Sequence, residues 1–301
     1  MNNKKKMINP SDRKIFTEDD SLTNRALERK QENKDYTPVI LKRTDEAFRH
    51  PDDILEKAIE AGLEQHDRPL FSLFLSAISA GLILGFAGMC VALISQLFPA
   101  AENFMLNRLA VAFVYPLGFI ICLMSGTQLF TEHTAMAVYP VLDKKAKLKS
   151  LFTLWTVVLI GNLVGTLLSS ILLFFADPVI SAQQGIVDIA HHLTQFSFKE
   201  IFISAVLAGW LMAQGGWLVL ATPPTSSQIL CIFIVTFIIG FGGLHHSIAG
   251  SAEIFSGLLH SSRPLYKESA ISLASSILGN LLGGSFFVGF LNYAHIKKTQ
   301  S

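Results

Sequence analysis

The segment GFGGLHHSIAG, residues 240–250, places the adjacent histidines His245 and His246 between glycines in an otherwise apolar stretch. An imidazole in such surroundings can exchange a proton, bind a metal or donate a hydrogen bond to an anion. Ionisable side chains inside an apolar segment of membrane-spanning length cost several kcal/mol unless they face an interior. We therefore expect His246 to serve a function, and His245 either to share it or to face the packed side.

A second polar segment, residues 125–138 (SGTQLFTEHTAMAV), carries Thr131 and Glu132 within another apolar stretch. Glu132 and Glu253 are interpreted either as acceptors of backbone N–H groups or as contacts of a substrate. If the two segments meet, their side chains also offer possible metal ligands: Glu132, His133, His245, His246 and Glu253. Adjacent histidines rarely share one metal and no HExxH motif occurs, so we expect no resident metal and no enzyme activity.

The composition of the 301-residue chain is that of a membrane protein: 50% of its residues are hydrophobic and 16% are charged. Residues 1–68 hold 14 of the 24 Lys and Arg and 15 of the 23 Asp and Glu. This segment is predicted to be soluble, with residues 1–45 disordered or loosely docked. Residues 52–65 (DDILEKAIEAGLEQ) have a helical apolar period, typical of an amphipathic helix at the membrane or of a short solvated helix.

The apolar remainder, residues 69–295, is expected to be the transmembrane domain, followed by a tail at 296–301. About 20 apolar residues are needed to cross a bilayer as a helix. Six stretches meet this length: Leu70–Phe98, Leu109–Leu142, Leu151–Phe175, Ile201–Ala221, Ile229–Leu259 and Ile271–Ala294. The second and fifth are too long and too rich in glycine and polar residues to be simple rods.

Basic residues indicate the orientation of these spans. With six spans, the basic N-terminal segment, the loop with Lys144 and Lys147, and the C-terminal tail fall on one side. We expect that side to be cytoplasmic, in a multi-pass protein of the inner or plasma membrane that contacts lipid and binds no nucleic acid. The three cysteines lie within apolar runs without CxxC spacing, and no cofactor is expected.

The transmembrane part repeats itself. Residues 76–88 (SAISAGLILGFAG) resemble 204–216 (SAVLAGWLMAQGG), and 160–168 (IGNLVGTLL) resemble 278–286 (LGNLLGGSF). Each repeat then holds three spans, so the second copy must be inverted in the bilayer. Inverted repeats place a site near the midplane at interrupted helices, which predicts that residues 125–138 and 242–255 are breaks that meet there.

The segments YPLGFIICLMSGTQLFTEHT and GGLHHSIAG resemble the second-span and fifth-span motifs of the formate/nitrite transporter family. The resemblance covers residues 70–295, and LFTE, AVYPV and GSAEI are similar to a branch of YfdC type. It implies an aquaporin-like, all-α fold of six spans with broken second and fifth helices, assembled as a homopentamer with one pore through each protomer.

By motif, the resemblance implies that His246 is the pore histidine and that Thr131 lies in the second-span loop. It places hydrophobic constrictions at Tyr115 and Ile239 on the outer side, and at Phe119 and Phe130 on the cytoplasmic side.

The chain departs from the family pattern at three positions near the pore. His245 stands where an acidic residue is usual, Gly250 stands where an asparagine is usual, and Glu132 replaces a small polar residue. These changes alter charge and hydrogen bonding near the pore, so the resemblance to the family does not by itself identify the substrate of this chain.

Half-helix N-termini carry partial positive charge, which favours a small monovalent anion near the midplane. An apolar constriction opposes a bare carboxylate and hardly opposes its neutral acid. The hypothesis is that the anion takes a proton in the vestibule or from His246 and crosses as the acid. The alternatives are a non-transporting membrane scaffold or sensor and, less favoured, an intramembrane metalloenzyme.

Overall fold

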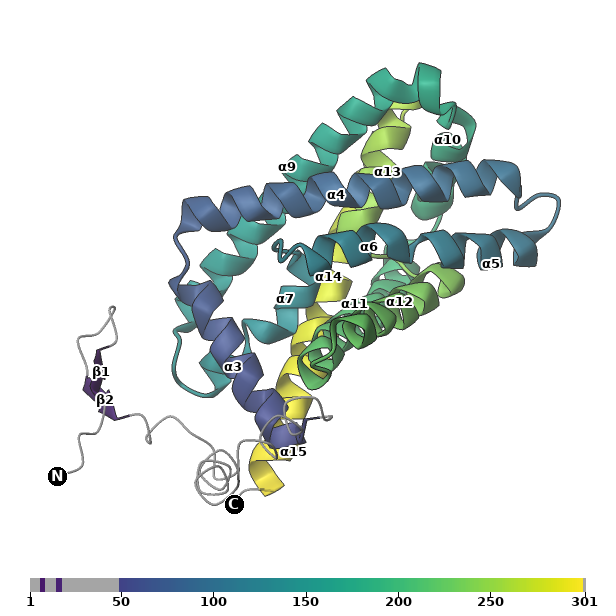
Figure 1. Ribbon diagram of the computed structural model, residues 1–301. Coiled ribbons are helices and arrows are strands. Elements are labelled where there is room, and N and C mark those ends of the chain that lie inside the picture. Colours follow the sequence, from purple (N-terminus) through teal and green to yellow (C-terminus); the bar gives the residue numbers. More distant parts are fainter. Residues whose placement is uncertain (1–5, 9–14, 18–48, 300–301) are drawn as a thin grey trace.

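The computed structural model describes residues 6–8, 15–17 and 49–299 (Figure 1). Two short strands, β1 (Lys6–Ile8) and β2 (Ile15–Thr17), pair antiparallel. The rest of the expected N-terminal tail lies outside the described residues. Residues 49–299 contain helices and no strand, so the predicted all-α class is confirmed for the membrane part.

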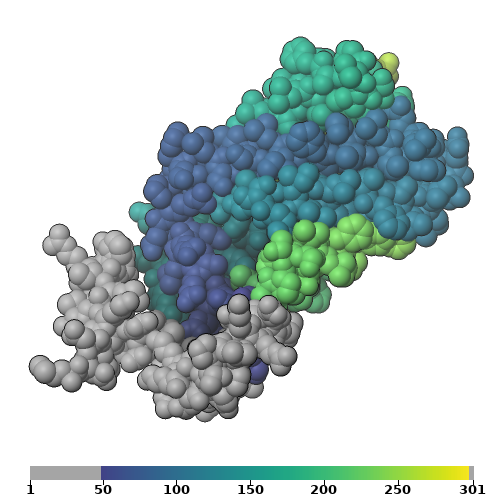
Figure 2. Space-filling model, viewed as in Figure 1, coloured from purple at the N-terminus to yellow at the C-terminus, as the bar shows by residue number. Residues whose placement is uncertain are grey.

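Six helical stretches of the described chain are long and apolar enough to cross a membrane, as predicted. Many of their large apolar side chains are exposed, which suits contact with lipid or with neighbouring subunits. Figure 2 shows the face of the molecule over which the first, second and fifth spans lie. The spans are α4 (Leu70–Leu97), α5–α6 (Phe104–Val114 and Pro116–Met124), α9 (Leu148–Ile180), α11 (Phe198–Ala221), α12 (Thr225–Gly242) and α14–η1–α15 (Tyr266–Leu282, Gly283–Phe290 and Leu291–Thr299).

The second and fifth spans are interrupted, as their glycines and polar residues predicted. After α6 the chain resumes helix in α7 (Phe130–Met136) and α8 (Tyr139–Leu142). After α12 it resumes in α13 (Ser247–His260). Gly126 and Gly243 lie in the two breaks with φ of +66° and +58°, a backbone conformation that favours glycine.

The internal repeat of the sequence reappears in the helix packing. The third span α9 lies against α4, and α14 of the sixth span lies against α11. A methyl group at Gly165 would overlap the carbonyl oxygen of Ile78, and one at Gly283 would overlap that of Val206. Small residues therefore let equivalent helix pairs of the two repeats approach equally closely.

Helix α3 (Pro51–Asp67) contains the predicted helix 52–65 and is docked on the bundle rather than solvated. Its face of Ile54, Leu55, Ala58 and Ile59 is buried in one cluster with α7, α8 and α11. The ring of His66 forms hydrogen bonds with Ser150 Oγ at 2.8 Å and with the Ala137 carbonyl oxygen at 2.9 Å. The end of the molecule that α3 covers is called the α3 face below.

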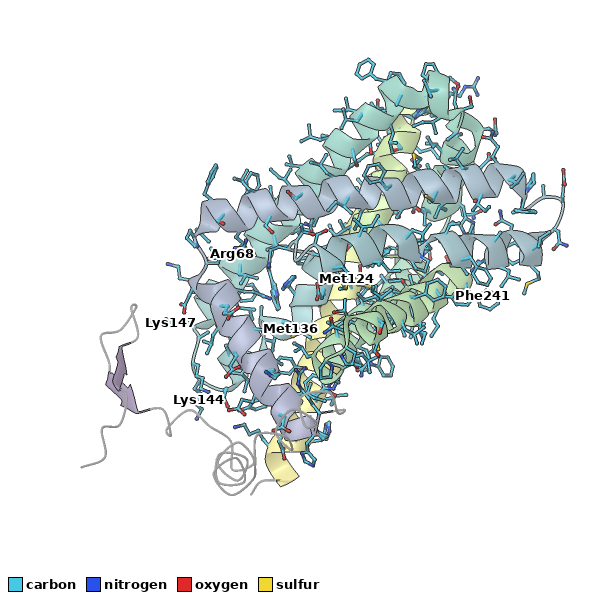
Figure 3. The ribbon with its side chains drawn as sticks, viewed as in Figure 1. Arg68, Met124, Met136, Lys144, Lys147 and Phe241 are labelled. Atoms are coloured by element: carbon cyan, nitrogen blue, oxygen red, sulfur yellow. The ribbon has the colours of Figure 1, made fainter. Side chains whose placement is uncertain are left out.

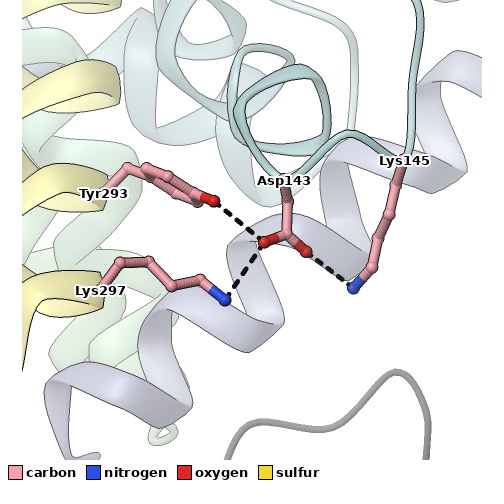
Figure 4. A network of polar contacts seen from close by, with 4 residues as sticks. All are labelled: Asp143, Lys145, Tyr293 and Lys297. Carbon is pink, nitrogen blue, oxygen red and sulfur yellow. Dashed lines mark hydrogen bonds and ion pairs between the residues drawn. The ribbon is translucent and has the colours of Figure 1, made fainter. Parts of the chain in front are cut away.

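Asp143, between α8 and α9, ties this face to the C-terminal helix (Figure 4). Its carboxylate accepts from Lys145 Nζ at 2.9 Å, Lys297 Nζ at 3.2 Å and the Tyr293 hydroxyl at 3.1 Å. Burial raises the pKa of this carboxyl, but the hydrogen bonds and charges of the two lysines outweigh burial and lower the pKa below 3.8. Asp143 is therefore an ionised link between the α8–α9 loop and α15.

The opposite end is covered by α10 (Gln183–Thr194) and is called the α10 face. This segment lies between the predicted spans Leu151–Phe175 and Ile201–Ala221, where no helix was predicted, and the structure has a helix that packs on α13 and α4. Figure 3 places Arg68, Lys144 and Lys147 toward the α3 face and Phe241 far from them, at the other side of the molecule. Basic side chains thus gather at the end where α3 lies.

Candidate functional site

Two buried asparagines hold the broken helices in place. Asn162 on α9 accepts from the Phe130 N–H at 2.9 Å and donates to the carbonyl oxygens of Gln128 and Ala77 at 2.9 and 2.8 Å. The contacts with Phe130 and Gln128 satisfy backbone groups at the break in the second span, and the contact with Ala77 ties the break to α4.

Asn280 does the same for the fifth span. It accepts from the Ser247 N–H at 2.7 Å and donates to the carbonyl oxygens of His245 and Ala205 at 3.0 and 2.7 Å. The two clamps use equivalent positions of the two repeats, so the breaks are held in related geometry about the pseudo-twofold axis.

His246 lies at the N-terminus of α13 and bonds through both ring nitrogens. Nδ1 accepts from the Ala249 N–H at 3.1 Å, so the ring caps the helix. A neutral ring that accepts at Nδ1 carries its proton on Nε2, a tautomer that follows from the hydrogen bonds. Nε2 lies 2.7 Å from Oγ1 of Thr131 and donates to it, which joins the two broken helices.

Aromatic and aliphatic side chains surround this contact. The rings of Phe119 and His246 meet edge to face with centroids 5.0 Å apart, and Tyr115 lies 5.0 Å from Phe119. Phe130 and Ile239 are also fully buried. The four proposed constriction residues are therefore all in the core, where unpaired charge is poorly tolerated.

A cavity of about 340 Å³ opens toward the α10 face and reaches His246. Its exposed lining residues, among them Phe104 and Asp188, mark the mouth. Buried lining residues at the inner end include Tyr115, Leu193, Ile239, His246, Gly250 and Glu253. Two of the proposed constriction residues, Tyr115 and Ile239, line this cavity, whereas Phe119 and Phe130 do not.

Charged groups from two elements reach the cavity wall. Arg108 on α5 donates to the Phe241 carbonyl oxygen at 3.2 Å, and its guanidinium lies 4.9 Å from the ring centre of Phe104. Burial, and then the charge of Arg108, lower the pKa of His192 on α10, so His192 is neutral at pH 7. Arg108 is consequently the fixed positive charge of the described cavity lining at neutral pH.

Glu132 and His245, two departures from the family pattern, do not line the cavity. Glu132 is half-buried on α7, where its side chain packs beside Gly216 of α11 and Met136. The ring and N–H of His245 both bond Ser204 Oγ on α11, at 3.0 and 3.1 Å, and the ring contacts Phe196. The structure thus brings His246 and Thr131 together and directs His245 to the packed side.

The residues considered as metal ligands do not converge. Within the part of the chain that the structure describes, no three His, Cys, Asp or Glu side chains form a group able to hold a metal ion. His133 Nδ1 lies 2.7 Å from the Leu129 carbonyl oxygen of its own helix.

Several residues of the cavity were missed by the sequence reading. Arg108 was not among the predicted site residues, and Asp188 and His192 belong to α10, a helix that was not predicted. The i, i+4 pair Asp188 and His192 is the signal that a helix could have placed both on one face.

Six spans in two inverted halves, with two broken helices that meet at a histidine below a cavity, define a membrane channel or transporter. The family model described as Formate/nitrite transporter matches residues 52–294. The Inner membrane protein YfdC of Escherichia coli (strain K12) is 32% identical over 257 residues, which cover 82% of this chain and 79% of that protein. The chain belongs to the formate/nitrite transporter family.

Solved structures share the fold. An FNT family ion channel superposes with a TM-score of 0.74 at 18% identity, covering 81% of this chain and 98% of that one. A pentameric formate channel with formate bound gives a TM-score of 0.63 at 20% identity, covering 76% and 98%. The predicted family and the predicted multi-pass membrane fold are both confirmed.

Proposed function

We propose that this protein conducts a small monovalent weak-acid anion such as formate or nitrite, together with a proton. One observation carries the proposal: the His246–Thr131 hydrogen bond lies at the inner end of a cavity whose walls there include the ring of Tyr115 and the aliphatic chains of Leu193 and Ile239. Such walls oppose a bare anion by several kcal/mol and admit its neutral acid. Transport, with no covalent conversion of the solute, is the activity proposed.

Two features of the cavity favour anions at its mouth and floor. The guanidinium of Arg108 lines the wall, and the N-terminal turn of α13 supplies His246 and Gly250 to the inner end. A helix N-terminus carries about half a positive charge, which attracts an anion before it reaches the constriction.

We propose that the protein is a homopentamer with one pore in each protomer, and that both termini are cytoplasmic. The pentameric formate channel that shares the fold supports the assembly. The basic side chains at the α3 face support the orientation, because positive loops are retained on the cytoplasmic side. The cavity then opens to the outside.

Purified protein in liposomes tests the function through His246. We expect His246→Phe to abolish pH-dependent uptake of formate and nitrite. A phenyl ring can neither accept the hydrogen bond that caps α13 nor donate one to Thr131. His246→Asn restores the helix cap and is expected to keep assembly, again without uptake. His191→Phe, an exposed histidine of α10 outside the cavity, is the matched control; equal uptake by all variants would remove His246 from the mechanism.

A further inference from the structure

Glu253 is a buried carboxyl group at the inner end of the cavity. It lies two helical turns beyond His246 on α13, is 8% exposed and lines the same cavity. Its side chain packs across Gly88 of α4, where an added methyl group would be 3.4 Å from Cγ. Among the described residues, no hydrogen-bonding or ionic partner is found for its carboxyl.

A carboxylate in this position lacks the compensation that a buried charge needs. Buried ions in proteins are paired, or they avoid the cost of desolvation by changing protonation state. A carboxylic acid at position 253 is neutral and keeps one O–H that can donate into the cavity. An anion that enters the cavity therefore meets a hydrogen-bond donor that also carries a transferable proton.

His246 has no such proton to give. Its Nδ1 already accepts from Ala249, and its single ring proton, on Nε2, is engaged by Thr131. Loss of that proton would create an imidazolate in the core, and protonation of Nδ1 would break the helix cap. A proton that neutralises the anion must come from another group.

The other titratable and charged groups that face the cavity are less suited to donate. Asp188 on α10 is exposed and accepts from Gln184, and His192 is paired with Gln195. Arg108 stays charged. From the elements packed against Glu253, the remaining neighbours are Tyr115, a weak acid, and the non-titrating residues Gly88, Met89, Ala92, Leu173, Ile186, Ile189 and Ser256.

We propose that Glu253 is the proton donor of the outer cavity, an inference that rests on the proposed transport of weak-acid anions. The anion accepts the Glu253 O–H hydrogen bond, takes the proton and forms the neutral acid. The O–H bond of Glu253 breaks and an O–H bond of the acid forms. The carboxylate left behind takes a proton from water that enters through the cavity mouth, and the hydroxide ion formed leaves by the same way. The neutral acid then passes His246.

The test is the external-pH profile of formate uptake by liposomes that contain wild type, Glu253→Gln or Glu253→Asp. Glutamine keeps the volume and a hydrogen-bond donor but has no proton to transfer. We expect Glu253→Gln to lower initial uptake at least about tenfold near pH 7, since a positioned acid typically contributes this much or more. The deficit should shrink toward about pH 5, where more formate enters already protonated. Glu253→Asp should retain part of the rate and the wild-type profile.

Each outcome separates the two proposals. If wild type takes up no formate or nitrite beyond protein-free liposomes, the proposed function fails. If wild type is active and Glu253→Gln matches it, or is slower by one constant factor at every pH, Glu253 is not the donor. Size-exclusion chromatography of each variant checks assembly, and Glu102→Gln, an exposed carboxyl near the same mouth, is the matched control.

Discussion

Glu132 departs from the family pattern and directly follows Thr131 in the sequence, but it does not line the described cavity. An ionised carboxylate about 4 Å from an anion would repel it by about 4 kcal/mol at an effective dielectric near 20. The position of Glu132 beside Gly216 and Met136 removes it from the cavity that opens to the α10 face. Its presence is therefore compatible with an anionic substrate.

We predict that Glu132→Gln keeps formate uptake within about twofold of wild type and changes, at most, its dependence on pH. The isosteric amide keeps the packing against α11 and removes only the titratable proton. Uptake and assembly of the purified variant provide the measurement. Loss of all weak-acid uptake in a correctly assembled Glu132→Gln would identify Glu132, rather than His246, as the primary site.

At the residue scale, the sequence predicted which residues belong to the candidate site better than it predicted the contacts that they make. The glycine-flanked His246 and the Thr131 of LFTE stood out because polar groups are rare in apolar spans. His246 caps α13 through Nδ1, and His245 turns toward Ser204. Both contacts depend on the backbone conformation of the break, which residue spacing does not predict. The roles of these residues in transport stay predictions.

The broken helices depend on single side chains from neighbouring spans. Asn280 supplies three hydrogen bonds to backbone groups, including the Ser247 N–H that opens α13. We predict that Asn280→Ala lowers the free energy of unfolding by about 3 kcal/mol, because unsatisfied buried backbone groups cost about 1 to 3 kcal/mol each.

Thermal unfolding in detergent measures this effect, and Asn162→Ala should have a similar one because the clamps are equivalent. Asn107→Ala is the control, since Asn107 donates one side-chain bond, to the Phe98 carbonyl oxygen, outside the breaks. A change no larger than that of the control would mean that the asparagines do not hold the breaks.

The Asp143 link between the α8–α9 loop and α15 predicts a pH dependence of stability. The pKa of Asp143 is lowered by folding, so its contribution is present above the unfolded value and is lost as pH falls through the folded value. We expect Asp143→Asn to cost about 1 kcal/mol near pH 7 and nothing once the pH is low enough to protonate wild-type Asp143 in the folded protein. Thermal midpoints across this range give the difference; the same difference at every pH, or an equal effect of Asp67→Asn at an exposed site, would contradict the link.

At the element scale, the spans and their breaks followed from apolar length and glycine placement. Helix α10 was not predicted, because its sequence QQGIVDIAHH has few apolar residues. Its position depends on packing against α13 and α4. The π-helical stretch η1 (Gly283–Phe290) was also not predicted, since its glycines signalled close packing without a change in helical pitch.

The whole molecule combines a cavity that reaches His246 with large exposed apolar side chains on its outer surface. The cavity opens at the α10 face, while α3 covers the other end and buries its apolar side there. Large apolar side chains are exposed on α4, α5 and α12, which fits a membrane and supports the proposed contact between protomers. Repeat symmetry and charge bias were visible in the sequence, whereas the one-sided cavity depends on α10 and Arg108.

The measurement that tests the central claim most directly is simultaneous recording of formate uptake and external pH in liposomes containing the wild-type protein. An inward formate gradient is imposed without a pH gradient, and protein-free liposomes give the background. Transport of the anion with a proton predicts uptake above background accompanied by alkalinisation of the external medium, with about one proton removed for each formate. Absence of formate and nitrite uptake above background, or uptake of only cations or neutral solutes, would contradict the account.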